Sequence, residues 1–93
     1  MTNNDVIRLF IQGETKGKTA HLKIEGDKLI NYTTAIAYRV APDMYLINGE
    51  HYSRTTSTIQ NSLKRHLESA SIEFSISEGE SDFMENMYSY INE

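Results

Sequence analysis

The residues that could carry out catalysis or hold a metal are three histidines and a cluster of hydroxyl side chains. His21, His51 and His66 do not share the spacing of metal ligands, and the chain has no cysteine that could complete a metal site. Serines and threonines gather in residues 53–58, but a serine nucleophile needs a neighbouring base and a sharp turn that exposes it. Helix capping explains this cluster more simply. We therefore expect that the protein is not an enzyme and uses neither a metal nor a cofactor.

A basic segment with two glycines, Gly13-Glu14-Thr15-Lys16-Gly17-Lys18-Thr19, is similar to a phosphate-binding loop. The spacing between its glycines is one residue too short for a P-loop. In addition, residues 20–25 alternate between apolar and polar side chains as a strand does, whereas a P-loop must be followed by a helix whose amides point at the phosphates. We interpret residues 13–19 as a basic connecting loop and expect no nucleotide site there.

Charge is unevenly distributed along the chain. Residues 1–67 contain all nine lysines and arginines and six acids, a net charge of +3, whereas residues 68–93 contain seven acids and no lysine or arginine, a net charge of −7. These two values account for the formal net charge of −4. The separation has three interpretations: an acidic surface for a basic partner, a segment that covers the chain's own basic surface, or a solvated helix that aids solubility.

The acidic segment supplies the first candidate binding surface. Its members are expected to be exposed carboxylates that meet a basic surface on a partner protein: Glu73, Glu78, Glu80, Asp82 and Glu85. Electrostatic complementarity of this kind increases the association rate and the specificity of a protein–protein contact.

The alternative candidate surface is basic and would bind nucleic acid. It consists of five cations that come together if residues 13–19 lie near a helix expected at 57–69: Lys16, Lys18, Arg54, Lys64 and Arg65. Phosphates attract such cations, and the six tyrosines of the chain offer surfaces on which bases can stack. However, a charge of +3 is small, no known nucleic-acid-binding motif is present, and the acidic segment would repel phosphates unless it moves away.

The element that must position most of these cations is the helix expected over residues 57–69. Ser57 and Gln60 have the spacing of a capping box, in which each side chain bonds a backbone amide of the first turn. Apolar residues then recur at helical spacing at Ile59, Leu63 and Leu67. The serines and threonines before Ile59 have low helix propensity, so we expect the helix not to extend further towards the N-terminus.

The residues before this helix have the alternation and the turn residues of a β-meander. Expected strands lie at residues 6–12, 20–25, 29–32, 35–40, 44–47 and 50–52. We expect a three-residue loop at Gly26–Lys28, because it pairs Ile24 with the apolar Ile30. A two-residue loop would instead set Leu22 against Asn31. Two further turns are expected at Pro42-Asp43 and, as a hairpin, at Asn48-Gly49.

The acidic segment is expected to form an edge strand followed by a helix. Ile72, Phe74 and Ile76 alternate with polar residues, and charges on an edge strand discourage edge-to-edge association. A helix is expected over residues 81–92, where apolar residues recur at helical spacing: Phe83, Met84, Met87, Tyr88 and Ile91. This stripe is expected to be a core or dimer contact, and a detachable partner-binding helix is the alternative.

These elements predict a single α+β domain over residues 1–93, with a basic strand-rich part at 1–67 and an acidic strand and helix at 68–93. The expected fold is a small antiparallel β-meander of about five to six strands packed against one central helix, with a C-terminal amphipathic helix. The chain has no cysteine, no signal-peptide pattern and no apolar run of bilayer length, so we expect a cytoplasmic protein with no membrane partner. A monomer and a homodimer both remain open.

A resemblance to known proteins covers roughly residues 10–67. The residues that carry it are, in order, Gly13-x-Thr15-Lys16-Gly17, Leu22-x-Ile24-Glu25-Gly26-Asp27, Ile36-Ala37-x-Arg39 and Tyr52-Ser53-x-Thr55-Thr56-Ser57-x-x-Gln60. This order resembles small uncharacterised domains of bacteriophage, plasmid and archaeal proteins, and the last motif is its most specific part. The family has no settled activity, so the resemblance implies no catalytic residues.

The phage or mobile-element origin that this resemblance implies favours one class of function. Small, acidic, cysteine-free phage proteins commonly act by binding host machinery, and some anti-CRISPR proteins occupy basic nucleic-acid channels with acidic surfaces. We therefore expect a non-enzymatic, protein-binding inhibitor in the host-cell cytoplasm, for example an anti-CRISPR protein directed at a Cas effector. The alternative is a nucleic-acid-binding accessory domain built from the five cations named above.

Overall fold

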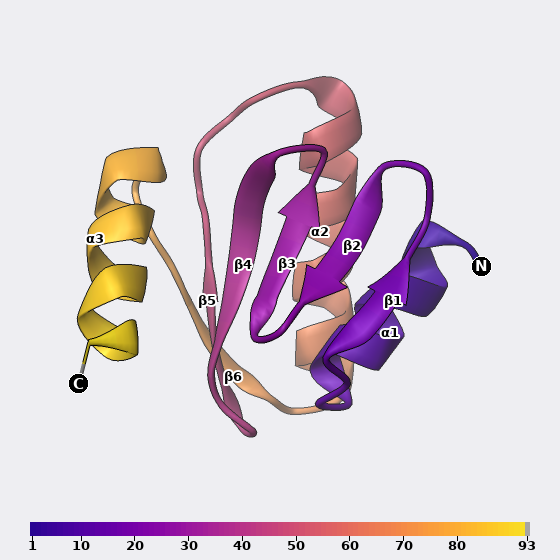
Figure 1. Ribbon diagram of the computed structural model, residues 1–93, viewed down its shortest axis with the longest axis horizontal. Coiled ribbons are helices and arrows are strands. Elements are labelled where there is room, and N and C mark those ends of the chain that lie inside the picture. The colour runs from indigo at the N-terminus through magenta and orange to yellow at the C-terminus, as the bar shows by residue number, and fades with distance from the viewer. Residues whose placement is uncertain (93) are drawn as a thin grey trace.

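The computed structural model describes residues 1–92, in which three helices and six strands follow one another along the chain (Figure 1). The elements are α1 (Asn3–Ile11), β1 (Lys16–Lys18), β2 (Leu22–Glu25), β3 (Lys28–Asn31), β4 (Thr34–Ala41), β5 (Met44–Ile47), α2 (Arg54–Ser69), β6 (Glu73–Ile76) and α3 (Glu80–Ile91). The six strands form one sheet in the order β1-β2-β3-β4-β5-β6, and neighbours are antiparallel except β5 and β6, which are parallel. The α+β class with a mostly antiparallel sheet is thus confirmed. Glu93, the last residue of the expected domain, lies outside the described residues.

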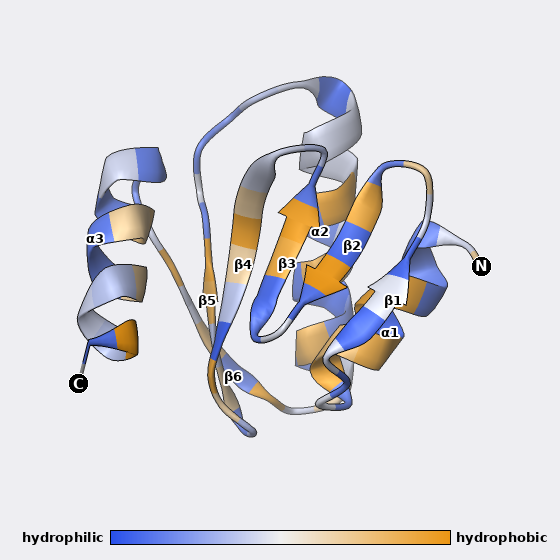
Figure 2. Cartoon of the chain, in the orientation of Figure 1, coloured by the Kyte–Doolittle hydropathy of each residue, from blue (hydrophilic) through white to orange (hydrophobic). Residues whose placement is uncertain are grey.

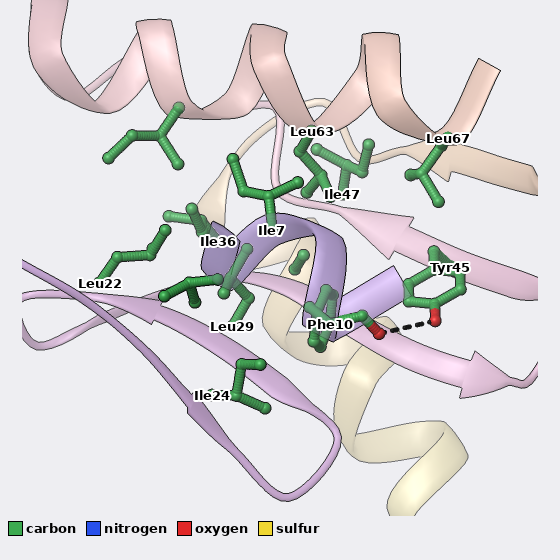
Figure 3. Close-up of a cluster of buried hydrophobic side chains, with 13 residues drawn as sticks. Ile7, Phe10, Leu22, Ile24, Leu29, Ile36, Tyr45, Ile47, Leu63 and Leu67 are labelled. Carbon is green, nitrogen blue, oxygen red and sulfur yellow. Dashed lines mark hydrogen bonds between the residues drawn. The ribbon is translucent and has the colours of Figure 1, made fainter. Parts of the chain in front are cut away.

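Helices cover both faces of the sheet, and the main core lies on the face shared by α1 and α2. Figure 1 shows these two helices behind the strands and α3 beside β4 and β5. The core, drawn in Figure 3, consists of Val6, Ile7, Phe10, Leu22, Ile24, Leu29, Ile36, Ala37, Tyr45, Ile47, Ile59, Leu63 and Leu67. The expected packing against one central helix is not confirmed, because α1 contributes to this core as α2 does.

Residues 6–12, expected to be a strand, belong to helix α1. Thr2 and Asp5 form a capping box: the Thr2 hydroxyl accepts a hydrogen bond from the Asp5 N–H, and the Asp5 carboxylate accepts one from the Thr2 N–H. Val6 and Phe10 are fully buried, as the spacing of a helix face requires. An apolar run as short as this fits a buried strand and a buried helix equally well, and the capping residues before it decide between the two.

The same cap makes stability depend on pH. Two hydrogen bonds to the Asp5 carboxylate lower its pKa from 3.8 to about 2. The bond from the Thr2 backbone has the larger effect, and the bond from the Arg8 guanidinium has the second largest. Because the folded state favours the ionised form of Asp5, the carboxylate stabilises the fold fully above pH 3.8. This contribution to stability is lost as the pH falls towards 2. We expect the urea midpoint of Asp5→Asn to fall less than that of the wild type over this range. Asp43→Asn, at an exposed turn, is the control, and equal slopes for all three proteins would contradict the prediction.

The β2–β3 hairpin has a two-residue loop, Gly26-Asp27, and not the three-residue loop that was expected. Leu22 pairs with Asn31 and Ile24 pairs with Leu29, and Gly26 adopts a φ of 64° that glycine tolerates. On β2 the ribbon alternates between hydrophobic and hydrophilic residues (Figure 2). The expectation failed because it required an apolar partner for Leu22, whereas Asn31 is buried with its polar atoms satisfied.

Asn31 is satisfied by two hydrogen bonds that cross the core face. Its Nδ2 donates to the carbonyl oxygen of His21 at 2.9 Å, and its Oδ1 accepts from the Thr56 hydroxyl of α2 at 2.7 Å. A buried side-chain amide with hydrogen-bond partners lowers the folding stability far less than an unpaired amide does. A polar residue can therefore occupy a core-facing position. The bond to Thr56 also ties the first turn of α2 to the sheet.

Helix α2 begins one turn earlier than expected, at Arg54. Its cap is Ser53, whose hydroxyl accepts a hydrogen bond from the Thr56 N–H at 3.2 Å. Gln60 does not complete a capping box with Ser57, because its Nε2 donates to the carbonyl oxygen of Asn48 at 2.7 Å. The serines and threonines are therefore the first turn of the helix, and tertiary hydrogen bonds outweigh their low helix propensity.

The expected hairpin at Asn48-Gly49 and the strand at 50–52 are absent, and residues 48–53 form the connection from β5 to α2. The Asn48 side chain organises this connection by donating to the Ala35 carbonyl oxygen at 3.1 Å and accepting from the Glu50 N–H at 3.0 Å. A Cβ atom at Gly49 would collide with the carbonyl oxygen of Ser77. Glycine is thus required for a close approach between two backbones and not for a turn.

The C-terminal elements confirm the expected strand and helix. β6 occupies Glu73–Ile76 at the edge of the sheet, and α3 spans Glu80–Ile91. The parallel pairing of β6 with β5 was not expected, and it follows from the long crossover through α2. The segment expected to be a basic loop also contains a strand, because β1 pairs antiparallel with β2.

Candidate interaction surfaces

The acidic residues gather where α3 begins. Gly79 is the residue before the helix and offers no side chain to cap it, and the carboxylate of Glu50 accepts a hydrogen bond from the Glu80 N–H at 3.2 Å. The Asp82 carboxylate accepts one from the Glu78 N–H at 3.3 Å. Carboxylates at this position suit the positive end of the helix dipole.

Four of the five expected partner-binding acids are neighbours in the structure, and the fifth is not. We name Glu78, Glu80, Asp82 and Glu85 the acidic end of α3; all four are exposed. Glu73 is exposed at the other end of β6. Glu50 joins the acidic end through its bond to α3, and sequence reasoning missed it because thirty positions separate it from Glu80.

The acidic end carries charges that the rest of the described chain does not neutralise. Within residues 1–92, ion pairs join Arg8 to Asp5, Lys23 to Glu25 and Arg39 to Asp27, and none involves residues 73–85. As far as residue 92, the acidic segment therefore forms no ion pair with the chain's own basic surface, which was one interpretation of the charge separation.

A small separate core fixes α3 on the sheet. Phe83 and Met87 are buried against Leu46 of β5, and Met84 packs at the margin of this cluster. The apolar stripe is thus a core contact for these three residues. A dimer formed through them would require α3 to leave the sheet. Tyr88 and Ile91 are about half exposed, at 50% and 44%.

Tyr52 lies behind the acidic end and has a raised pKa. Burial is the main cause, a hydrogen bond that its hydroxyl accepts from Asn48 lowers the pKa in part, and the nearby Glu80 and Glu50 carboxylates raise it further. The phenol is consequently protonated at neutral pH and serves as a neutral neighbour of two carboxylates.

The five cations proposed for nucleic-acid binding lie in two groups on opposite sides of the sheet. Lys16 and Lys18 flank Gly17, which packs against Leu9 of α1, so the alternation of the strand directs both lysines to the other face. The remaining three belong to α2, in the layer that covers the main core: Arg54, Lys64 and Arg65. The structure does not bring the five cations together.

Two lysines that sequence reasoning left out lie beside Lys16 and Lys18. Lys18 pairs with Lys23 of β2, and Lys16 pairs with Glu25, which in turn pairs with Lys28 of β3. The alternation of apolar and polar residues at 22–25 indicated that Lys23 lies on the face of the sheet away from the core. The neighbourhood of all four lysines became visible only with the register of three strands.

The histidines show one contact that bears on catalysis. The hydroxyl of Ser57 lies 3.1 Å from Nδ1 of His51 on an exposed part of the molecule. A serine nucleophile also needs a group that orients the base, and within residues 1–92 the other ring nitrogen of His51 has no hydrogen bond. No group of three or more His, Cys, Asp or Glu side chains in the described chain is arranged to hold a metal ion.

Comparisons of this chain with protein families, with curated proteins and with solved structures found no match. The resemblance of residues 10–67 to phage, plasmid and archaeal domains therefore stays a prediction. None of the three helices in the described part of the chain has the length and hydrophobicity needed to cross a lipid bilayer.

Proposed function

We propose that the protein is a non-enzymatic binding protein whose acidic end of α3 contacts a basic surface of a partner protein. The observation that carries this proposal is the exposure of four neighbouring carboxylates without an ion pair in residues 1–92. Three of them lie on a helix that Phe83 and Met87 hold against the sheet, and Glu78 lies just before it, so a partner would meet them in a fixed arrangement.

The dipole of α3 explains only part of this charge. Glu80 and Asp82 lie in the first turn, where a negative charge is favourable. Glu85 lies one turn further on, where the dipole has little effect and where its charge repels that of Asp82 at the i,i+3 spacing. Local stability therefore does not account for Glu85, whereas complementarity to a basic surface does.

The partner that suits this surface best is a basic groove that normally holds nucleic-acid phosphates, because carboxylates spaced along a helix present negative charge in a similar way. In its most specific form the proposal is an anti-CRISPR inhibitor that competes with nucleic acid for the channel of a Cas effector. Glu73 is a peripheral contact in this proposal, since β6 separates it from the acidic end.

The test compares two triple variants that change the net charge equally. One replaces Glu80, Asp82 and Glu85 with lysine, and the control replaces three exposed acids elsewhere with lysine: Glu14, Asp43 and Glu68. We expect the first variant to bind purified Cas effectors at least about tenfold more weakly and to lose inhibition of DNA cleavage, and the control to stay within about twofold of the wild type.

Two results would count against the proposal. If no effector binds the wild-type protein, the anti-CRISPR form fails. If both triple variants weaken binding equally, net charge and not the acidic end determines the affinity. Far-UV circular dichroism should show that α3 remains helical in each variant, which excludes unfolding as the cause of lost binding.

A further inference from the structure

Four lysines form a compact patch on the face of the sheet opposite to α1 and α2. In the strand register Lys18 lies opposite Lys23. Glu25 of β2 lies opposite Lys16 on one neighbouring strand and opposite Lys28 on the other. Neighbouring strands are about 4.8 Å apart and alternate residues about 6.6 Å apart along a strand, so the four ammonium groups lie within reach of one extended anion. Glu25 bonds Lys23 at 3.3 Å, and the other three lysines have no ion pair within residues 1–92.

This patch is open to solvent. α1 and α2 occupy the opposite face, and α3 packs on β4 and β5 through Leu46, Ala35 and Val40. Figure 1 shows β1, β2 and β3 at the front with no helix before them. α3 therefore covers β4 and β5, whereas the four lysines lie on β1, β2 and β3.

At one end of the patch the surface is hollowed beside an exposed aromatic ring. The hollow has a volume of about 110 Å³, and its lining includes Lys18, Lys23, His21 and Tyr32. Tyr32 is 59% exposed, and its ring centroid lies 4.9 Å from that of His21 at an interplanar angle of 44°. Two lysines and an exposed aromatic residue thus line the same small hollow.

The backbone of Tyr32 has a conformation that aromatic residues rarely adopt. Tyr32 has a φ of 58°, in the left-handed region that favours glycine and asparagine over aromatic residues. Its N–H donates to the His21 carbonyl oxygen at 2.8 Å, which holds the conformation. A strained residue whose side chain is mostly exposed gains little from the core, and such residues cluster at functional sites.

We propose that the open face of β1–β3 binds single-stranded nucleic acid, with its phosphates at Lys16, Lys18, Lys23 and Lys28 and one base stacked on Tyr32. The lysines alone would accept any polyanion. The adjacent aromatic ring favours nucleic acid, because an unstacked base has a flat π-face that an acidic peptide lacks. A single strand fits better than a duplex, since this face of the sheet has no projecting helix or ribbon to enter a groove. This surface is independent of the acidic end of α3.

The test measures fluorescence anisotropy of labelled oligo-dT and oligo-rU of about 12 nucleotides at low salt. We expect Lys18→Gln/Lys23→Gln to weaken binding by about tenfold or more and to reduce the slope of log K against log salt by about 1.4. Lys64→Gln/Arg65→Gln on α2 is the matched control, because it removes the same charge from the opposite layer and should stay within about twofold of the wild type.

Tyr32 is tested with a pair of variants that keep the backbone intact. Tyr32→Asn removes the ring and suits the left-handed conformation, so the protein should fold, and we expect about fivefold to hundredfold weaker binding with an unchanged salt slope. Tyr32→Phe retains the ring and should stay within about twofold of the wild type. A thermal melt of each variant checks the fold.

Three results would overturn this proposal: no binding of either oligonucleotide at low salt, an equal loss in the α2 control, or full binding by Tyr32→Asn together with equal competition by polyglutamate. The last result would assign the face to acidic proteins. Reversing the charges of Glu80, Asp82 and Glu85 should not weaken oligonucleotide binding, which keeps this test separate from that of the proposed function.

Discussion

Replacing Arg39 with alanine is expected to lower the free energy of unfolding by about 2–4 kcal/mol, because charge-assisted hydrogen bonds and the packing of its buried stem are lost together. The Arg39 side chain is only 7% exposed, and its guanidinium connects three parts of the chain. It donates to the carbonyl oxygens of Phe10 and of Glu14, pairs with Asp27 at 3.0 Å, and donates to the Tyr45 hydroxyl at 3.2 Å. The Cζ atom of the guanidinium also lies 4.7 Å from the centroid of the Phe10 ring, as in a cation–π contact.

The loss is large because several partners lose their donor together. The carbonyl oxygen of Phe10 keeps the hydrogen bond from the Tyr45 hydroxyl at 2.9 Å, drawn in Figure 3, but that of Glu14 would lose its charged donor. The connection from α1 to β1 would then lose its attachment to the sheet.

Urea denaturation of three Arg39 variants separates the causes of this effect. Arg39→Lys keeps the charge but not the planar fork of donors, so its loss should lie between those of the wild type and Arg39→Ala. Arg39→Met keeps most of the side-chain volume, and it shows how much of the loss is packing. A change below about 1 kcal/mol for Arg39→Ala would contradict the role assigned to this residue.

Replacing Phe83 with alanine is expected to release α3 from the sheet while the rest of the protein stays folded. Truncating a buried phenylalanine costs about 3–5 kcal/mol, and Phe83 and Met87 supply the buried contacts of α3. Because their cluster with Leu46 is separate from the main core, the loss should fall on the docking of α3 and not on α1, α2 and the sheet.

Hydrogen exchange measured by mass spectrometry can test this prediction peptide by peptide. In Phe83→Ala the amides of 80–91 should exchange at nearly the rate of an unfolded chain, whereas those of α2 keep their protection. Tyr88→Ala is the control, since Tyr88 is half exposed and lies outside the buried cluster. Simultaneous loss of protection in α2 and α3 would show that the two cores unfold as one unit.

The same variant separates charge from geometry in the proposed function. Phe83→Ala leaves every carboxylate of the acidic end in place but removes the surface on which α3 is held. If binding to a basic partner needs a fixed arrangement, this variant should bind more weakly than the wild type at the same net charge.

Local patterns predicted the elements whose signals lie within the element. The alternation before Ser77 identified β6, and the helical spacing of Phe83 and Met87 identified α3. The same method failed at α1, where Val6 and Phe10 also fit a buried strand and the capping box of Thr2 with Asp5 was not used. It also failed at Gly49, because a requirement for close approach to Ser77 has no local signature.

The sequence by itself determined the α+β class, the C-terminal strand and helix, and the separation of charge, because each depends on residue types or on a periodicity within one segment. Only the tertiary structure decided which charges are neighbours. It separated Lys16 and Lys18 from the cations of α2, placed them beside Lys23 and Lys28, and brought Glu50 to Glu80. These neighbourhoods arise from strand register and from a helical crossover, which depend on contacts between residues far apart in the chain.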